Sequence, residues 1–186
     1  MVSRPGDPTD PERIAAEVRR VHAVVDEEVR NIAAWHGPRL KCRRGCSGCC
    51  QDGITVFQVE ATLIRLRHAD LLRDEEPAPA PGCAFLDAQG ACRIYEDRPY
   101  VCRTQGLPLR WIDDLREVGR VELRDICELN EEGPPIEELP AGSCWTLGPV
   151  EQKLANLQEE VTPGRKPRVP LRDLFRKPPD QGAAPF

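Results

Sequence analysis

Large apolar side chains are scarce in this sequence. Aromatic residues make up 5% of the 186 residues, there is one methionine, and the apolar fraction as a whole is 40%. Because burial of large apolar side chains supplies most of the free energy of folding, such a composition predicts a modest core. Additional cross-links would stabilise a domain of this kind.

Long hydrophobic runs are also missing. No stretch approaches the roughly 18 consecutive apolar residues of a membrane-spanning helix. The chain begins MVSRPGDPTDPER, which has early charges and prolines in place of the apolar run of a secretory signal. These features predict a cytoplasmic protein without membrane contact, in a compartment where stable disulfides are rare.

The charge distribution argues against nucleic acid as a partner. The net charge is -5, although the segment 162–186 carries six basic and two acidic residues. An acidic body lacks the positive surface that attracts phosphates. The basic tail from Thr162 is expected to be solvated and dispensable for metal binding. The alternatives for its apolar stretch, VPLRDLF, are docking on the body and docking on a protein partner.

Nine cysteines are the most informative feature of the sequence. An odd number of cysteines in a reducing compartment favours metal binding over a disulfide framework. Redox-active thiols and simple packing are the alternatives.

Four of these cysteines lie in KCRRGCSGCC, residues 41–50, with the spacing C-x3-C-x2-C-C. Gly45 and Gly48 disfavour a helix and suit a tight loop. Adjacent side chains diverge, so Cys49 and Cys50 cannot serve one tetrahedral ion equally well. They fit two metals, a polynuclear cluster, or one ligand beside a buried thiol.

A second set, Cys83, Cys92 and Cys102, lacks a fourth thiol, and Cys127 lies beyond it. We therefore predict a shared centre in which Cys42, Cys46 and one or both members of the adjacent pair meet the second set. The predicted metal ligands are Cys42, Cys46, Cys49, Cys50, Cys83, Cys92, Cys102 and Cys127. Cys144 has no companion and is predicted to be a packing residue.

Basic residues accompany both sets of cysteines. Cations near thiols lower their pKa and neutralise thiolate charge. Arg103 directly follows Cys102 and is the residue that we expect to contact the cofactor or its ligands. The other flanking cations are Arg39, Lys41, Arg43, Arg44, Arg93 and Arg98.

The patterns predict the α+β class: a small irregular, metal-stapled domain with an N-terminal amphipathic helix, a second helix and short β-hairpins. Helices are expected over 9–35, beginning with a capping box at Thr9 and Glu12, over 56–72 and over 149–160. A hairpin is expected within 83–95, a second hairpin or an irregular pair within 107–127, and an extended proline spacer, unable to pack, over 75–82. We divide the chain into an N-terminal helical segment (1–38), a cysteine-cluster domain (39–130), an extension with a short helix (131–161) and a basic, proline-rich, irregular tail (162–186).

Three segments together resemble a known family. They are C-RRG-C-SG-CC, then CAFLDAQGACRIYEDRPYVCRTQGLPLR, then CELN. They are similar to the zinc- or iron-chelating cysteine-cluster family, called the CxxCxxCC or YkgJ type, although the first spacer here has three residues where the family name has two. The resemblance implies a metal-binding protein that holds zinc or iron, the latter also as an iron–sulfur cluster such as 4Fe-4S, and leaves its biological task open.

Other interpretations remain open at this point. C-x3-C-x2-C is also the cluster-binding spacing of radical-SAM enzymes, but the strand–helix repeats that those enzymes need do not follow it. A zinc ribbon would need two C-x2-C pairs, and only Cys46 and Cys49 have that spacing. A small enzyme or redox protein using a 4Fe-4S cluster and a zinc-stapled interaction module are the two alternatives. No Ser–His–Asp set or phosphate loop is visible, so the balance is against an enzyme.

Overall fold

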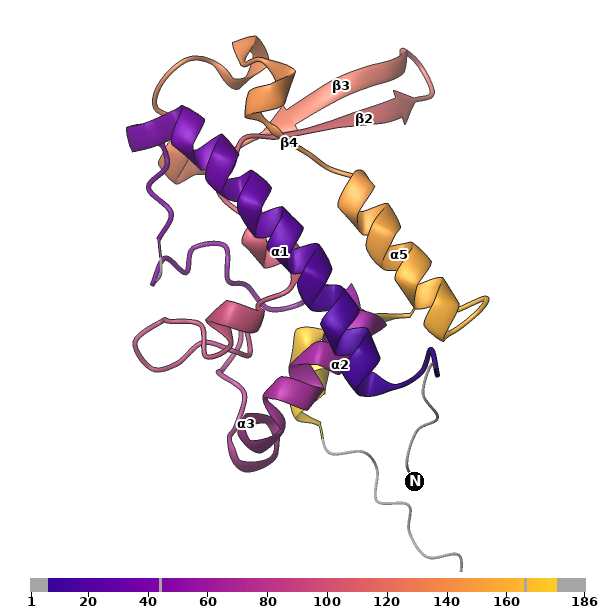
Figure 1. The fold of residues 1–186 in the computed structure, drawn as a ribbon. Helices are drawn as coiled ribbons and strands as arrows, with labels where there is room; N and C mark the ends of the chain where they lie inside the picture. The colour runs from indigo at the N-terminus through magenta and orange to yellow at the C-terminus, as the bar shows by residue number, and fades with distance from the viewer. Residues whose placement is uncertain (1–6, 44, 166, 177–186) are drawn as a thin grey trace, which may run out of the picture.

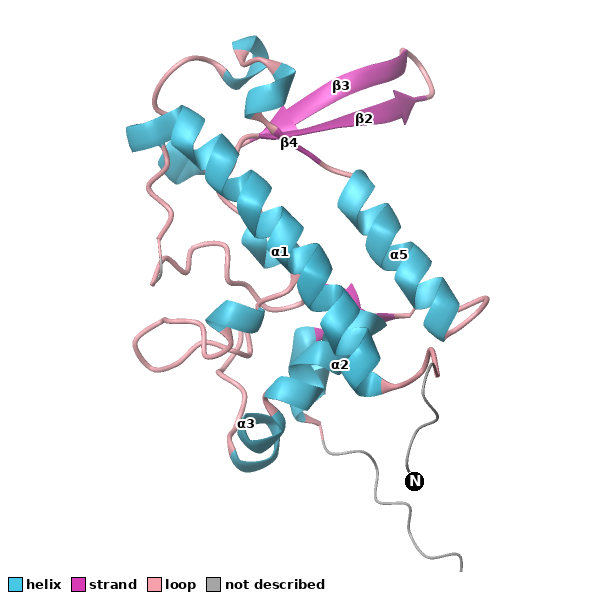
Figure 2. Ribbon diagram, viewed as in Figure 1, coloured by secondary structure: helices cyan, strands magenta, loops and turns pink. Residues whose placement is uncertain are grey.

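The computed structural model describes residues 7–43, 45–165 and 167–176. A long N-terminal helix crosses the molecule, with shorter helices, two small sheets and extended loops around it (Figures 1 and 2). The predicted α+β class is confirmed. No helix among these residues is long and apolar enough to cross a membrane.

Helix α1 spans Pro11–His36 and buries the apolar stripe that the sequence predicted, from Ile14 to Ile32. Its N-cap is Asp10, and Pro11 takes the first helical position, where its missing N–H is not needed. The predicted capping box at Thr9 is wrong, because the Thr9 hydroxyl donates to Asp7 Oδ1 at 2.7 Å instead.

The predicted helix over 56–72 is divided into three elements. Strand β1 (Thr55–Phe57) leads directly into α2 (Gln58–Arg67), and α3 (Ala69–Asp74) follows after His68. Helix α5 (Pro149–Val161) agrees closely with the short helix predicted near the C-terminus. Helices α1, α2 and α5 contact one another and form the helical layer of the molecule (Figure 1).

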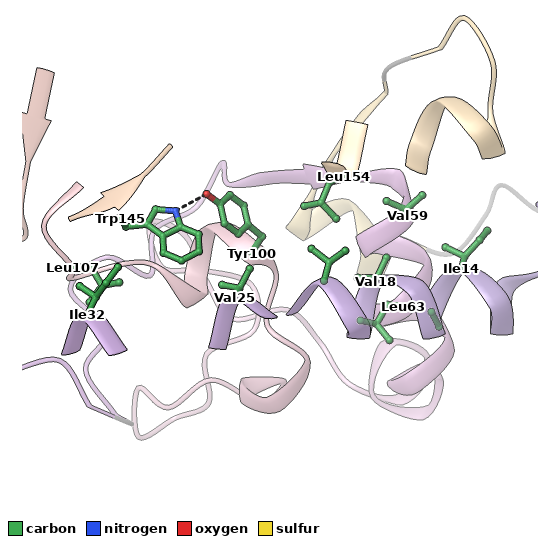
Figure 3. Packing of buried hydrophobic residues seen from close by; sticks show 12 residues of the cluster. Ile14, Val18, Val25, Ile32, Val59, Leu63, Tyr100, Leu107, Trp145 and Leu154 are labelled. Atoms are coloured by element: carbon green, nitrogen blue, oxygen red, sulfur yellow. Dashed lines mark hydrogen bonds between the residues drawn. The ribbon is translucent and has the colours of Figure 1, made fainter. Parts of the chain in front are cut away.

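The main core lies within this layer and extends toward the sheet. Val18 and Val25 of α1 face Val59 and Leu63 of α2 and Leu154 of α5. Figure 3 shows these side chains and, at one end of the cluster, a hydrogen bond of 2.8 Å from the Trp145 indole to the Tyr100 hydroxyl. Each aromatic polar group is thereby satisfied within an apolar environment.

The larger sheet contains the predicted hairpin of residues 107–127. Strands β2 (Leu109–Leu115) and β3 (Gly119–Asp125) are antiparallel, and β4 (Trp145–Thr146) pairs with β2 in parallel. The other predicted hairpin, within 83–95, is not a pair of strands. It is a loop closed by the Leu86–Cys92 bridge and a turn, after which α4 (Tyr100–Arg103) begins.

The expectation of an irregular tail is wrong for residues 168–175. Strand β5 (Arg168–Pro170) pairs with β1, and a 3₁₀ helix covers Leu171–Phe175. Its residues Leu171 and Leu174 are buried in a second apolar cluster with Phe85 and Ile94. The apolar residues of VPLRDLF thus pack on the body; residues 177–186 lie outside the described part.

The proline spacer also packs on the body, contrary to expectation. The Asp52 N–H donates to the Pro81 carbonyl, and the Ala78 N–H donates to the Ala84 carbonyl. Arg172 donates to the carbonyls of Ala78 and Gly82. Extended backbone leaves its carbonyls free, and here neighbouring donors use them.

The boundaries of the four predicted chain segments, at residues 38, 130 and 161, stay a prediction.

Candidate metal centre

Seven of the eight predicted ligands line one cavity of about 650 Å³. They come from the loop of residues 42–50, from the loop around the Leu86–Cys92 bridge, and from α4. Segments far apart in the sequence therefore converge on one place beside the helical layer. The seven are Cys42, Cys46, Cys49, Cys50, Cys83, Cys92 and Cys102.

Five of these residues form a group that we call the inner thiols: Cys49, Cys50, Cys83, Cys92 and Cys102. The Cys83 N–H donates to the Cys50 carbonyl at 2.9 Å, next to a bridge between Gln51 and Gly82. The thiols of Cys49 and Cys50 are hydrogen-bonded to each other. Backbone pairing thus joins the end of the first cluster to the start of the second set.

The inner thiols have strongly perturbed pKa values. Burial raises the pKa of Cys83 and Cys92, and it raises that of Cys102 to about 12, with nearby Cys83 and Cys92 adding to the effect. The Cys50 thiol donates a hydrogen bond that lowers the pKa of Cys49 to about 6 and raises that of Cys50 itself. Without a cation the group therefore holds most of its protons.

The remaining three predicted ligands, Cys42, Cys46 and Cys127, form a second group that we call the outer thiols. The Cys42 and Cys127 thiols are hydrogen-bonded to each other. Burial is the first cause that raises the pKa of Cys42, and the charges of Cys127 and Cys46 act in the same direction. Cys42 and Cys46 line the same cavity as the second set, and Cys42 also interacts with Cys127. The shared centre stays a prediction.

Asn130 is a site residue to which the sequence analysis gave no role. Its side chain is completely buried, and Nδ2 donates to Cys42 Sγ at 3.4 Å and to the Gly106 carbonyl at 2.7 Å. Its Oδ1 accepts from the Lys41 N–H at 2.7 Å. The only signal in the sequence was its place in the CELN segment, three residues after Cys127.

Gly106 makes room for the Cys42 thiol. A Cβ atom at this position would lie 2.4 Å from Cys42 Sγ and 3.1 Å from Cys42 Cβ. The φ of Gly106 is +91°, a conformation that residues with a side chain rarely adopt. The backbone at Gly106 therefore leaves space for the side chain of Cys42, a predicted ligand, and we call this space the cradle.

The donor set fits zinc or iron. Sulfur-only ligands select soft or borderline metals, and both zinc and iron–sulfur clusters use cysteine thiolates. Among the residues that the structure describes, no three cysteine, histidine, aspartate or glutamate side chains already converge on one ion position. Binding at this site therefore requires the thiols to turn inward from their positions in the cavity wall.

Arg103 supports the loop around the site through hydrogen bonds. Its guanidinium donates to Asp26 Oδ2 at 2.6 Å and to the carbonyls of Arg98 and Glu96. It is buried and also lines the cavity. These contacts anchor the residue that follows Cys102 to α1; a direct contact with a cofactor stays a prediction.

Other candidate residues lie in different surroundings. His36 Nε2 is 2.6 Å from the Ser143 carbonyl oxygen, and His22 Nε2 is 3.2 Å from Glu60 Oε1. Cys144 is buried, and Arg124 lies 3.9 Å from its sulfur, in agreement with the packing role predicted for it. Arg44, one of the flanking cations, lies outside the described residues.

The comparisons with known proteins agree with this geometry. Residues 41–128, a segment that includes all eight predicted ligands, match the CxxCxxCC family, which is described as "Putative zinc- or iron-chelating domain". No curated protein and no solved structure matches the chain. The resemblance seen in the sequence is thus confirmed over residues 41–128, which match the model of the CxxCxxCC family.

Proposed function

We propose that this protein chelates zinc or iron through the inner and outer thiols, and that the metal–sulfur bonds join the loops of residues 42–50, 83–102 and 127. The observation that carries this proposal is the single cavity lined by seven thiols from separate loops. A cluster of partly buried thiols offers little packing advantage over apolar residues, whereas a cation makes their thiolate forms favourable.

The energetics of the site favour a structural contribution of the metal. Ligands from loops that are far apart in sequence must be brought together, and the entropic cost of closing the intervening chain rises only logarithmically with its length. Several metal–sulfur bonds exceed that cost, since structural zinc binds small domains with about 10–16 kcal/mol. Thiolate ligands must stay reduced, so we place the protein in a reducing compartment such as the cytoplasm.

An iron–sulfur cluster, such as 4Fe-4S, is the second candidate. It is supported by the adjacent residues Cys49 and Cys50 and by a cavity of about 650 Å³, more space than one ion with four sulfurs needs. Such a cluster would make the protein a redox protein or a small enzyme. With zinc, the protein would be an interaction module whose loops are cross-linked by the metal and which binds a protein partner.

Anaerobic purification followed by elemental analysis and a visible spectrum tests the proposal. We expect at least one equivalent of zinc or iron for each chain. Zinc gives a colourless protein, while an iron–sulfur cluster gives a brown protein whose absorption bleaches on reduction. A folded chain that contains neither metal, after growth with both supplied, would contradict the proposal.

A further inference from the structure

The two groups of thiols differ in the number of ligands that they offer. The inner group has five, one more than a tetrahedral ion can use. The outer group has three, one fewer than a tetrahedral ion needs, and its member Cys42 is exposed to solvent. A four-coordinate metal held by the outer thiols alone would keep one position for a ligand from solvent.

Two of the outer thiols, Cys42 and Cys127, are held near each other by a hydrogen-bonded frame, in which the Asn130 N–H donates to the Cys127 carbonyl and Asn130 Nδ2 donates to Cys42 Sγ. Arg39 Nε donates to the Asn130 carbonyl at 2.8 Å, and Asn130 Oδ1 accepts from the Lys41 N–H. Arg39 also donates to the carbonyls of Glu131 and Pro134. This frame ties the start of the first loop to the segment that follows Cys127, although the two are far apart in sequence.

The spacing of these thiols suits ligands of one ion. Two sulfurs bound at about 2.3 Å to one tetrahedral zinc lie about 3.8 Å apart, which is close to the separation of hydrogen-bonded thiols. Cys42 and Cys127 are in such contact, and Cys46 is the next thiol along the first loop. Rotation of the three side chains toward one another would complete a three-sulfur site.

Among the described residues, the other thiols, His36 and the Asn130 amide nitrogen are engaged elsewhere or are unable to act as a fourth ligand. The other five candidate thiols contact or interact with one another, and Cys144 lies beside Arg124. His36 is engaged with the Ser143 carbonyl, and the Asn130 amide nitrogen is a donor that cannot bind a cation.

We propose that Cys42, Cys46 and Cys127 form a second metal site, separate from that of the inner thiols, which binds a divalent cation such as Zn²⁺ or Fe²⁺ with three thiolates and one open position. This inference rests on the proposed chelating function. Sites with three protein ligands keep a position for water or another exogenous ligand. The cation at the outer site therefore exchanges with solution, whereas the cation at the inner site is retained.

Exchange with Co²⁺ tests the separate site. Purified protein is incubated anaerobically with excess Co²⁺ and desalted, and its cobalt and resident metal are both quantified. We expect the wild type to take up about one equivalent of cobalt, with the intense sulfur-to-cobalt absorption of thiolate ligands, and to keep its resident inner metal. The Cys127→Ser variant should take up at least ten-fold less cobalt and still keep that metal, while Cys144→Ser, the matched control, behaves like the wild type.

Several results would overturn the inference. Cobalt uptake by Cys127→Ser equal to that of the wild type would exclude the outer site. Loss of all metal from a Cys127→Ser chain with unchanged circular dichroism would indicate one shared centre. Wild-type protein that keeps its metal but exchanges none also contradicts the inference, and this result does not depend on folding of a variant. A wild type with neither resident metal nor cobalt would overturn the proposed function as well.

Discussion

The helical layer and the cysteine loops are held together in different ways. In the helical layer, α1, α2 and α5 bury continuous apolar stripes against one another. The cysteine loops, residues 41–54 and 82–106, contain short turns, isolated bridges and, among their described residues, two short helices, the 3₁₀ helix Tyr95–Asp97 and α4. Apolar packing can hold the first region alone, whereas the second region needs a further source of stability to hold its thiols around a cavity.

The apolar contacts of the cysteine loops are themselves shared with distant segments. Phe85 and Ile94 are buried against Leu171 and Leu174, near the end of the described chain. Arg172 adds an ion pair with Asp52 and hydrogen bonds to the proline spacer. The C-terminal segment, residues 168–175, thus covers these loops as a lid, and its Leu171 also lines the cavity.

Removal of metal should show the difference in stability between the two regions most clearly. We expect a strong thiol-directed chelator to abolish hydrogen-exchange protection in residues 41–54 and 82–106, while α1, α2 and α5 stay protected. A loss of about 5 kcal/mol would lower the midpoint of thermal unfolding by roughly 10–20 °C. Unchanged protection and an unchanged midpoint after complete removal would show that packing alone holds the loops.

Loss of the C-terminal lid should have the next largest effect. The tail was expected to be dispensable for metal binding, but truncation after Val161 removes two buried leucines and Arg172. Leu174→Ala alone should cost about 2–5 kcal/mol, the usual range for a buried leucine. Urea unfolding measures this change, and exposed Arg176→Ala is the matched control, expected to change stability by less than about 0.5 kcal/mol. Equal stability of the two variants would argue against the lid.

The helical layer could be predicted from the sequence better than the loops could. Apolar residues at helical spacing marked α1 and α5 within a few residues, since the stripe itself determines the burial. The strand Arg168–Pro170 was missed, because it depends on pairing with β1, far away in the sequence; the division of the predicted helix at His68 was also missed. The family pattern indicated which cysteines are candidate ligands. Their division into inner and outer thiols depends on long-range contacts, such as that of Asn130 with Cys42, which leave no local signal in the sequence.

Gly106→Ala should disturb the outer thiols selectively. The new Cβ would lie 2.4 Å from Cys42 Sγ, so either the thiol or the backbone must move. We expect at least a ten-fold loss in cobalt uptake, together with a destabilisation of about 1–3 kcal/mol from the strained backbone. Gly142→Ala is the control, since a Cβ there meets no atom within 4 Å. Normal cobalt uptake by Gly106→Ala would show that the cradle has no part in binding.

Alkaline pH should weaken the metal-free protein more than the metal-bound protein. Burial raises the pKa of Cys102 from 9.0 to about 12 and also raises those of Cys83 and Cys92. A raised pKa in the folded state contributes stability that is present below pH 9 and is lost as the pH rises toward 12. Urea midpoints measured between pH 8 and 11 should fall for the metal-free chain, and should fall less when metal keeps the thiolates bound. Parallel curves for the two forms would contradict the assignment of these thiols as ligands.

The most direct test of metal chelation by these thiols is the metal content of two matched variants, Cys102→Ser and Cys144→Ser. Both replace one cysteine that is largely removed from solvent, but only Cys102 lines the cavity with the other thiols. We predict that Cys144→Ser keeps the wild-type amount of zinc or iron for each chain, whereas Cys102→Ser loses at least half of it. Full metal content in a folded Cys102→Ser protein would contradict the account.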